Sequence, residues 1–244
     1  VTISGASKPG NWGPIAEVTS STEVFSQGKQ SLRYESPVAN DSNAYLGFGR
    51  TVMEDWNRYT RLRLRVKCPD PNHGTMFVQL IAYKKDTEYA GVLTHVLLRA
   101  QEATMGWKEI DWDISEFDMT QMHRLAFYSY DRKGGAFKWQ PGQKLIVFID
   151  DIRLITPDIA VELEDEQEIG ITGADFPAAA VIAANSIRIG KAPATHEEIM
   201  VDEDGSFVSA VMVDEPLAKS EFDIEIRDSS HAGTGAYVFP VTLK

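Results

Sequence analysis

The segment Arg61-Leu62-Arg63-Leu64-Arg65-Val66-Lys67 alternates basic and apolar residues along its whole length. Successive side chains of a β-strand point to opposite faces of a sheet, so the alternation predicts a strand with one buried and one solvated face. Such half-solvated strands are typical of antiparallel sheets. The segment therefore predicts an antiparallel β-protein.

Segments of similar character follow along the chain, and they predict further strands at 76–83, 92–98, 124–130 and 145–154. Turns are indicated by His73-Gly74, Lys133-Gly134-Gly135 and Gln140-Pro141-Gly142-Gln143. A short turn of helix is expected at 115–122, with Ser115 and Asp118 as caps. Many short strands separated by such turns predict an all-β sandwich or barrel.

The composition limits the class of protein. The 244 residues include 24 basic and 36 acidic side chains, for a net charge of −12, and 43% of the residues are hydrophobic. This composition excludes collagen-like and disordered chains. The longest apolar run, 176–184, contains Pro177 and is far shorter than the roughly 20 residues of a membrane-spanning helix. We therefore expect a folded β-protein without a membrane span.

The charge is divided unevenly at Pro157. Residues 1–157 hold 19 basic and 18 acidic residues, a net charge of +1, whereas residues 158–244 hold 5 basic and 18 acidic residues, a net charge of −13. All five tryptophans lie in the first part. We therefore predict two domains, 1–157 and 158–244, joined at Thr156-Pro157-Asp158.

The second part has further strand candidates at 160–163, 180–184, 186–189, 198–201, 207–213, 221–227 and 236–243. Asp204-Gly205-Ser206 indicates a hairpin turn. About seven short strands predict a smaller immunoglobulin-like sandwich, here without the paired cysteines of antibody domains. An acidic run in this part could bind a cation, but it is more often a solvated edge that resists pairing with another sheet: Glu162, Glu164, Asp165, Glu166 and Glu168.

Two classes of partner or site are excluded by residue type. The sequence contains no cluster of lysine and arginine, and phosphate binding needs a basic surface, so we expect no nucleic-acid partner. The single cysteine, Cys68, can form neither an internal disulfide nor a thiolate metal cage. We expect it to be a small, partly buried side chain at a strand end.

Four local patterns follow one another in the first part. They are Gly28-Lys29-Gln30-Ser31-Leu32-Arg33-Tyr34, Asp55-Trp56-Asn57-Arg58-Tyr59, Gly106-Trp107-Lys108-Glu109-Ile110-Asp111 and Val147-Phe148-Ile149-Asp150-Asp151-Ile152-Arg153-Leu154. In this order and spacing they resemble the galactose-binding-like jelly-roll carbohydrate-binding modules that are attached to polysaccharide-degrading enzymes. The resemblance covers almost all of residues 1–157. It implies a jelly-roll β-sandwich that binds a polysaccharide or oligosaccharide.

The second part has its own resemblance. Gly173-Ala174-Asp175-Phe176-Pro177, the hairpin at 201–208 and the closing segment at 236–243 resemble the immunoglobulin-like modules of microbial surface and secreted proteins. Such modules generally act as spacers or contact surfaces between other domains. The chain begins at Val1 rather than Met, which we interpret as a processed or excised fragment. Together with the two resemblances, this leads us to expect a secreted or cell-surface protein.

The first resemblance implies a structural calcium ion near the closing strand, bound by Asp150. The period of that strand places Asp150 in one row with Phe148 and Ile152, which we interpret as the core face, and a buried carboxylate needs a compensating cation or hydrogen bonds. Calcium takes oxygen ligands, which a carbonyl near Gly28 and a carboxylate of Glu17 or Glu23 could supply. The alternative is a carboxylate that accepts hydrogen bonds from backbone amides.

The same resemblance implies a sugar site. Sugars present an apolar face and a rim of hydroxyl groups, so binding needs an aromatic platform and fixed polar groups. We expect Trp56 and Trp107 to be core residues. The predicted ligand-binding residues lie on strands and near loops, although ordinary packing is an equal alternative for each aromatic one: Tyr83, Trp112, Tyr128, Tyr130, Arg132 and Trp139.

The sequence offers little that indicates catalysis. It has no G-x-S-x-G or H-E-x-x-H motif, and its five histidines are scattered. Asp111 and Asp113 flank Trp112 and could serve a sugar site, but aspartate near a strand end is also ordinary turn chemistry. We therefore expect no enzyme activity in the chain itself.

The expected function is targeting: the module would bind a polysaccharide weakly and hold an attached enzyme or surface protein near it. One alternative is a structural component of a cell surface, adhesin or filament that acts through protein contacts. A second alternative is a polysaccharide-degrading enzyme, which would need a deep cleft with converging acid and base groups.

Overall fold

The structure is a computed structural model, and it describes residues 18–36, 45–70, 74–83, 89–115, 117–130, 142, 144–164, 167–214, 221–229 and 236–242. Within these ranges every regular element is a β-strand, which confirms the predicted all-β class. The described residues accordingly include no helix that could cross a bilayer. Contacts divide the chain into two compact units, and each is described by itself below.

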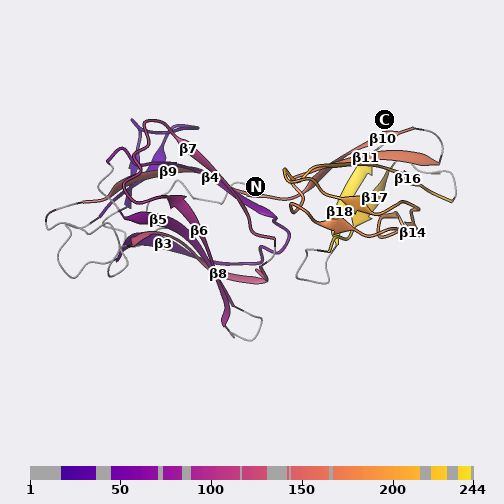
Figure 1. The fold of residues 1–244 in the computed structure, drawn as a ribbon, viewed down its shortest axis with the longest axis horizontal. Helices are drawn as coiled ribbons and strands as arrows, with labels where there is room; N and C mark the ends of the chain where they lie inside the picture. The colour runs from indigo at the N-terminus through magenta and orange to yellow at the C-terminus, as the bar shows by residue number, and fades with distance from the viewer. Residues whose placement is uncertain are drawn as a thin grey trace. The chain divides into compact units, whose positions relative to one another are not determined.

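The first unit comprises Val1–Trp56, Leu62–Trp112 and Met119–Leu154. One of its sheets has five strands in the order β1 (Val18–Ser21), β2 (Ser31–Glu35), β9 (Ile146–Ile155), β4 (Arg61–Lys67) and β7 (Lys108–Asp113). The other has four strands in the order β3 (Tyr45–Glu54), β8 (Gln121–Tyr130), β5 (Thr75–Tyr83) and β6 (Tyr89–Leu98). Figure 1 shows the two sheets as two layers.

The core of this unit lies between the two sheets. In β4 the apolar residues of the opening motif are buried and the basic ones are half-exposed, as their alternation predicts. Tyr34 of β2 stacks on Phe48 of β3, with ring centroids 4.7 Å apart, and Phe48 contacts Phe127 of β8 at 5.3 Å. Aromatic side chains from both sheets therefore interdigitate, and the unit is a β-sandwich.

The second unit comprises Asn57–Arg61, Asp113–Asp118 and Ile155–Lys244. Its sheets have three strands, in the order β10 (Asp158–Leu163), β11 (Glu168–Ala174) and β16 (Phe207–Met212), and four, in the order β14 (Ala192–Pro193), β13 (Arg188–Ile189), β17 (Glu221–Ile226) and β18 (Tyr237–Thr242). A further pair joins β12 (Val181–Ile182) to β15 (Ile199–Met200). The predicted turn before β16 is present, because Gly205 N–H donates to the Asp202 carbonyl at 3.0 Å.

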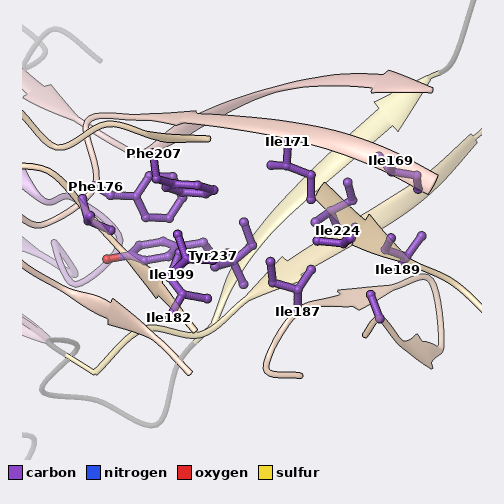
Figure 2. Packing of buried hydrophobic residues seen from close by; sticks show 14 of the residues in the cluster. Ile169, Ile171, Phe176, Ile182, Ile187, Ile189, Ile199, Phe207, Ile224 and Tyr237 are labelled. Atoms are coloured by element: carbon purple, nitrogen blue, oxygen red, sulfur yellow. The ribbon is translucent and has the colours of Figure 1, made fainter. Parts of the chain in front are cut away.

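Phe176 is fully buried in the second core, at the aromatic end of the cluster that Figure 2 shows. Its ring meets Phe207 and Tyr237 edge to face, with centroids 5.0 Å and 5.4 Å away. The Phe207 ring covers Gly173, where a Cβ would lie 2.1 Å from Phe207 Cε1. The second unit is thus also a β-sandwich, and its immunoglobulin-like topology stays a prediction.

The expected turn of helix at 115–122 is wrong for the residues that the structure describes there. Residues 115, 117 and 120 lie in turns or bends, residues 118 and 119 have no regular structure, and β8 begins at Gln121. The Ser115 hydroxyl and N–H both donate to Asp113 Oδ1, at 2.6 Å and 2.9 Å. Ser115 therefore stabilises a turn behind it instead of capping a helix ahead of it.

The single core face predicted for the closing strand is also wrong. Pairing with β2 places Val147 and Ile149 on the same face as the buried Tyr34 and Leu32. Asp151 then adopts φ +52, a left-handed conformation that shifts the alternation by one residue. Ile152 and Leu154, beyond this shift, are buried again. Asp150 therefore does not share one continuous row with Ile152.

Candidate functional site

The outward face of the sheet β3-β8-β5-β6 carries an ordered set of side chains, which we name the platform face. The strand registers arrange it in three rows across the four strands: Gly47, Tyr128, Phe77 and Val96; Gly49, Ala126, Gln79 and Thr94; Thr51, Arg124, Ile81 and Val92. The residues that alternate with them, such as Val78, Leu80 and Phe127, are fully buried. The platform face is thus the side of the sheet that does not contact the core.

The first row provides an aromatic surface. The rings of Phe77 and Tyr128 stack with centroids 5.2 Å apart and an angle of 22° between their planes, and both side chains are half-buried. Gly47 flanks Tyr128 closely, because a Cβ at this position would lie 2.4 Å from the Phe127 carbonyl oxygen. Because Gly47 has no side chain, nothing projects from this position beside the Tyr128 ring, so a flat molecule can approach the ring from this side.

The second and third rows provide polar groups. Gln79 Nε2 donates to Thr94 Oγ1 at 3.5 Å, and both groups are accessible to solvent. Arg124 is exposed, and its guanidinium lies over Gly49, where a Cβ would be 2.7 Å from Arg124 Nε. An aromatic pair with amide, hydroxyl and guanidinium groups beside it is a combination that suits a sugar.

The structure places the predicted ligand-binding residues unevenly. Tyr128 is on the platform face. The backbones of Tyr83 and Tyr130 lie at the ends of β5 and β8, where Tyr83 pairs with Tyr89 and Gln121, and Tyr130 with Tyr45 and Thr75. The side chains of these two tyrosines, and the whole of Arg132 and Trp139, lie outside the described residues, so their roles stay predictions.

Trp112 lies apart from the platform face. It is 8% exposed, and its ring stacks on the imidazole of His95 with centroids 5.3 Å apart. Burial, together with Lys108, lowers the pKa of His95, so the histidine is neutral in this contact at pH 7. Since packing accounts for Trp112, we leave it out of the proposed site. Trp56 is fully buried, as expected for a core residue, whereas Trp107 is only half-buried.

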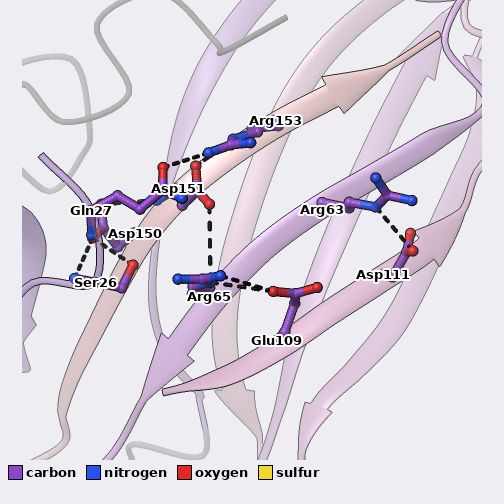
Figure 3. A network of polar contacts seen from close by, with 9 residues as sticks. All are labelled: Ser26, Gln27, Arg63, Arg65, Glu109, Asp111, Asp150, Asp151 and Arg153. Atoms are coloured by element: carbon purple, nitrogen blue, oxygen red, sulfur yellow. Dashed lines mark hydrogen bonds and ion pairs between the residues drawn. The ribbon is translucent and has the colours of Figure 1, made fainter. Parts of the chain in front are cut away.

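Asp150, the predicted calcium ligand, is 8% exposed and lies under the loop between β1 and β2. Its Oδ2 accepts hydrogen bonds from Ser26 N–H at 2.7 Å, Ser26 Oγ at 2.8 Å and Gln27 N–H at 3.0 Å. Its Oδ1 accepts one from Asp151 N–H at 2.8 Å. Figure 3 shows this group, which we name the Asp150 clasp.

The groups around Asp150 fit hydrogen bonding better than cation binding. Calcium needs oxygen atoms, whereas three of these four neighbours are N–H groups. Glu23 is exposed, and within the described ranges no three His, Cys, Asp or Glu side chains are grouped to hold a metal. Gly28 adopts φ +69 in this loop, and Glu17 lies outside the described residues. The arrangement matches the amide-bonded alternative, and a calcium ion at Asp150 stays a prediction.

A cavity of about 520 Å³ lies at the end of β3 and the start of β8. Its wall includes Met53, Asp55, His123 and Glu54. The Glu54 carboxylate accepts a hydrogen bond from the Trp56 indole at 3.1 Å, so it is held by the core. The cavity is formed where the β3–β8 register shifts between Thr51 and Glu54.

The sequence interpretation missed two features of the site. Gly47 and Gly49 lie in β3, a strand that is not among the predicted ones. Arg124 was also not identified. The sequence did contain a signal for Arg124. Residues 124, 126 and 128 occupy alternate positions of one strand, so Arg124 and Ala126 lie on the same face as Tyr128.

The sequence matches no family model and no curated protein. Solved structures that match include a family 11 carbohydrate-binding module from Clostridium thermocellum, in complex with a β-1,3-1,4-mixed-linked tetrasaccharide. It is 13% identical, the match covers 60% of this chain and 89% of that chain, and the TM-score is 0.40.

Two other modules match similarly. For a family 16 carbohydrate-binding module, the identity is 14%, the coverage 63% of this chain and 97% of that chain, and the TM-score 0.41. For a family 28 module specific for non-crystalline cellulose, the identity is 11%, the coverage 63% and 94%, and the TM-score 0.43. These values are too low to transfer a ligand to this chain.

Proposed function

We propose that the first unit binds a polysaccharide on the platform face and carries out no reaction on it. The observation that supports this most is the stacked pair of Phe77 and Tyr128, which is half-buried on the side of the sheet away from the core. A pyranose ring laid on this pair would cover its remaining apolar surface. Gln79 and Thr94, in the next row, would replace hydrogen bonds from its hydroxyl groups to water.

The platform face is open along its rows, and this favours binding of a chain interior. Gly47, beside Tyr128, carries no side chain, while the Arg124 side chain covers Gly49 and Ala126 in the next row. A polysaccharide bound in this way would hold any linked domain close to its substrate, which raises the effective concentration of that domain. The second unit would then act as a spacer or contact surface.

The test is isothermal titration calorimetry of the full chain against a panel of plant, algal and host polysaccharides. We expect Tyr128→Ala to weaken the binding by about five- to thirtyfold, which corresponds to about 1–2 kcal/mol for one aromatic contact. Phe25→Ala is the matched control, because Phe25 is 41% exposed in the loop between β1 and β2 and should leave the affinity unchanged.

Two outcomes would overturn the proposal. The first is that no polysaccharide of the panel binds to the wild-type chain. The second is that Tyr128→Ala and Phe25→Ala bind equally well. Release of reducing ends from a bound polysaccharide would support the enzyme alternative instead, and the carboxylates of the cavity at β3 and β8 would be the first to substitute.

A further inference from the structure

We infer that the platform face selects an anionic polysaccharide, one whose sugars carry a carboxylate or a sulfate ester. This inference rests on the proposed function and adds the chemical class of the ligand. The observation that carries it is Arg124, the one charged side chain in the three described rows of this face. Its guanidinium makes no hydrogen bond or ion pair with the part of the chain that the structure describes.

The arginines on the other sheet of the same unit, unlike Arg124, form ion pairs with carboxylates. Arg63 of β4 pairs with Asp111 at 3.0 Å, and Arg65 pairs with Glu109 at 3.1 Å (Figure 3). Arg153 of β9 pairs with Asp151 at 2.5 Å. Their carboxylate partners come from neighbouring strands or from two residues away. Among the described rows of its own sheet, Arg124 has no such carboxylate partner.

The position of the guanidinium matches the aromatic pair. Arg124 begins in the third row, but its Nε lies over Gly49 in the second row, next to the row of Tyr128 and Phe77. Adjacent rows on one strand face are about 7 Å apart, since each residue advances the strand by about 3.4 Å. A sugar stacked on the aromatic pair can therefore extend a charged substituent to the guanidinium without leaving the ring surface.

The chemistry of the group favours an anionic oxygen ligand. A guanidinium offers a planar fork of N–H donors that matches a carboxylate or a sulfate with two parallel hydrogen bonds. Gly49 keeps the fork in place, because any Cβ there would displace Arg124 Nε. The first part of the chain is close to neutral, with a net charge of +1, so it does not oppose an anionic ligand as the second part, with a net charge of −13, would.

Pairs of polysaccharides that share a sugar backbone but differ in charge separate the contribution of the charge to binding from that of the backbone. Polygalacturonate is compared with its methyl ester, and carrageenan with its desulfated form, by calorimetry or affinity electrophoresis of the full chain. We expect the wild type to bind at least one charged form about three- to tenfold more tightly than its uncharged partner. The preference should vanish when the ionic strength rises to about 1 M, where the Debye length is about 3 Å.

Amino-acid substitutions test which residues cause the preference for charged polysaccharides. Arg124→Gln should equalise the affinities for the charged and uncharged forms, and Arg124→Lys should restore only part of the preference. Gly49→Ala keeps the charge but displaces the fork, so it should also reduce the preference. Lys29→Gln removes one positive charge from an exposed position in the loop between β1 and β2, and it should change nothing.

The outcomes are distinguishable from those of the proposed function. Equal or tighter binding of both uncharged forms by the wild type, or a preference that survives in Arg124→Gln, would overturn the inference while polysaccharide binding stands. Loss of all binding in Tyr128→Ala supports the shared platform. Absence of binding to any polysaccharide, charged or not, refutes the proposed function and the inference with it.

Discussion

Asp150 shows at the scale of one residue how the loop between β1 and β2 is fixed to the sheet. Its carboxylate accepts hydrogen bonds from Ser26, Gln27 and Asp151. We expect Asp150→Ala to lower the free energy of unfolding by about 1–3 kcal/mol, because several partly buried donors lose their acceptor. Asp150→Asn keeps one oxygen and should cost less. Urea denaturation measures both, and an alanine variant as stable as the wild type would contradict the clasp.

The clasp also predicts the response to metal removal. Since N–H and hydroxyl groups already compensate the carboxylate, a chelator should leave Tm unchanged, as followed by circular dichroism. A fall in Tm that added calcium reverses would instead support the calcium site expected from the sequence.

Cys68 gives a second prediction for a single residue. It is fully buried rather than partly buried as expected, and burial raises the pKa of its thiol to about 12. The thiolate is the reactive form, so Ellman's reagent should label the native chain hardly at all at pH 8 and completely in urea. The folded state keeps this thiol protonated to a higher pH than the unfolded state does. The free energy of unfolding should therefore fall as the pH rises above about 8.5, the pKa of an unperturbed thiol. Rapid labelling of the native chain would contradict this burial.

Single residues also explain what the sequence could not predict. The burial of Asp150 and Trp56 followed from their positions in recognisable patterns. The left-handed conformation of Asp151, which shifts the closing strand by one residue, leaves no trace in the period of the sequence. Gly47 and Gly49 give no signal for a strand, because glycine is uncommon in strands, yet in β3 Gly47 permits the close approach of the β8 backbone.

At the scale of elements, the edges of the two sheets in the first unit meet through His95 of β6 and Trp112 of β7. Burial lowers the pKa of His95, so the folded state binds the proton less readily than the unfolded state. The stability from this contact is present above about pH 6.5, the pKa of an unperturbed histidine, and is lost as the pH falls through the lower pKa of the fold.

We therefore expect Tm to fall between about pH 7 and pH 5, before most carboxylates titrate, and His95→Gln to reduce that fall. Differential scanning fluorimetry over this range makes the comparison, and His123→Gln is the control. Identical pH profiles for the wild type and His95→Gln would contradict the assignment.

A strand could be predicted from the sequence where apolar and polar residues alternate regularly. In β4 every second side chain is buried, as the Arg-Leu repeat indicates. The segment 115–122 was not predictable in this way, because Ser115 can cap a helix or close a turn, and its bond to Asp113 decides for the turn. Across β3, β8, β5 and β6, the platform face depends on registers between strands far apart in the sequence, which no local pattern fixes.

At the scale of the whole molecule, the two cores make separate predictions. A Cβ at Gly173 would lie 2.1 Å from the buried ring of Phe207, so Gly173→Ala should destabilise the second unit by about 1–3 kcal/mol. Gly170→Ala, in the same strand, meets only the flexible end of Glu164 at 3.1 Å and should be tolerated.

Calorimetry should show that Gly173→Ala lowers one melting transition and leaves the other in place, with polysaccharide binding unchanged at 25 °C. A single transition that moves as a whole would contradict the predicted division into domains 1–157 and 158–244. Loss of binding in this variant would contradict the placement of the ligand on the first unit.

The most direct measurement of the central claim is the mapping of a bound oligosaccharide by backbone amide chemical shifts. We predict that the largest changes occur at the platform face, in Gly47, Gly49, Gln79 and Ala126, and that the amides of Ile171 and Ile224 in the second core stay unchanged. Shifts confined to the second unit, or to the loop between β1 and β2, would contradict it.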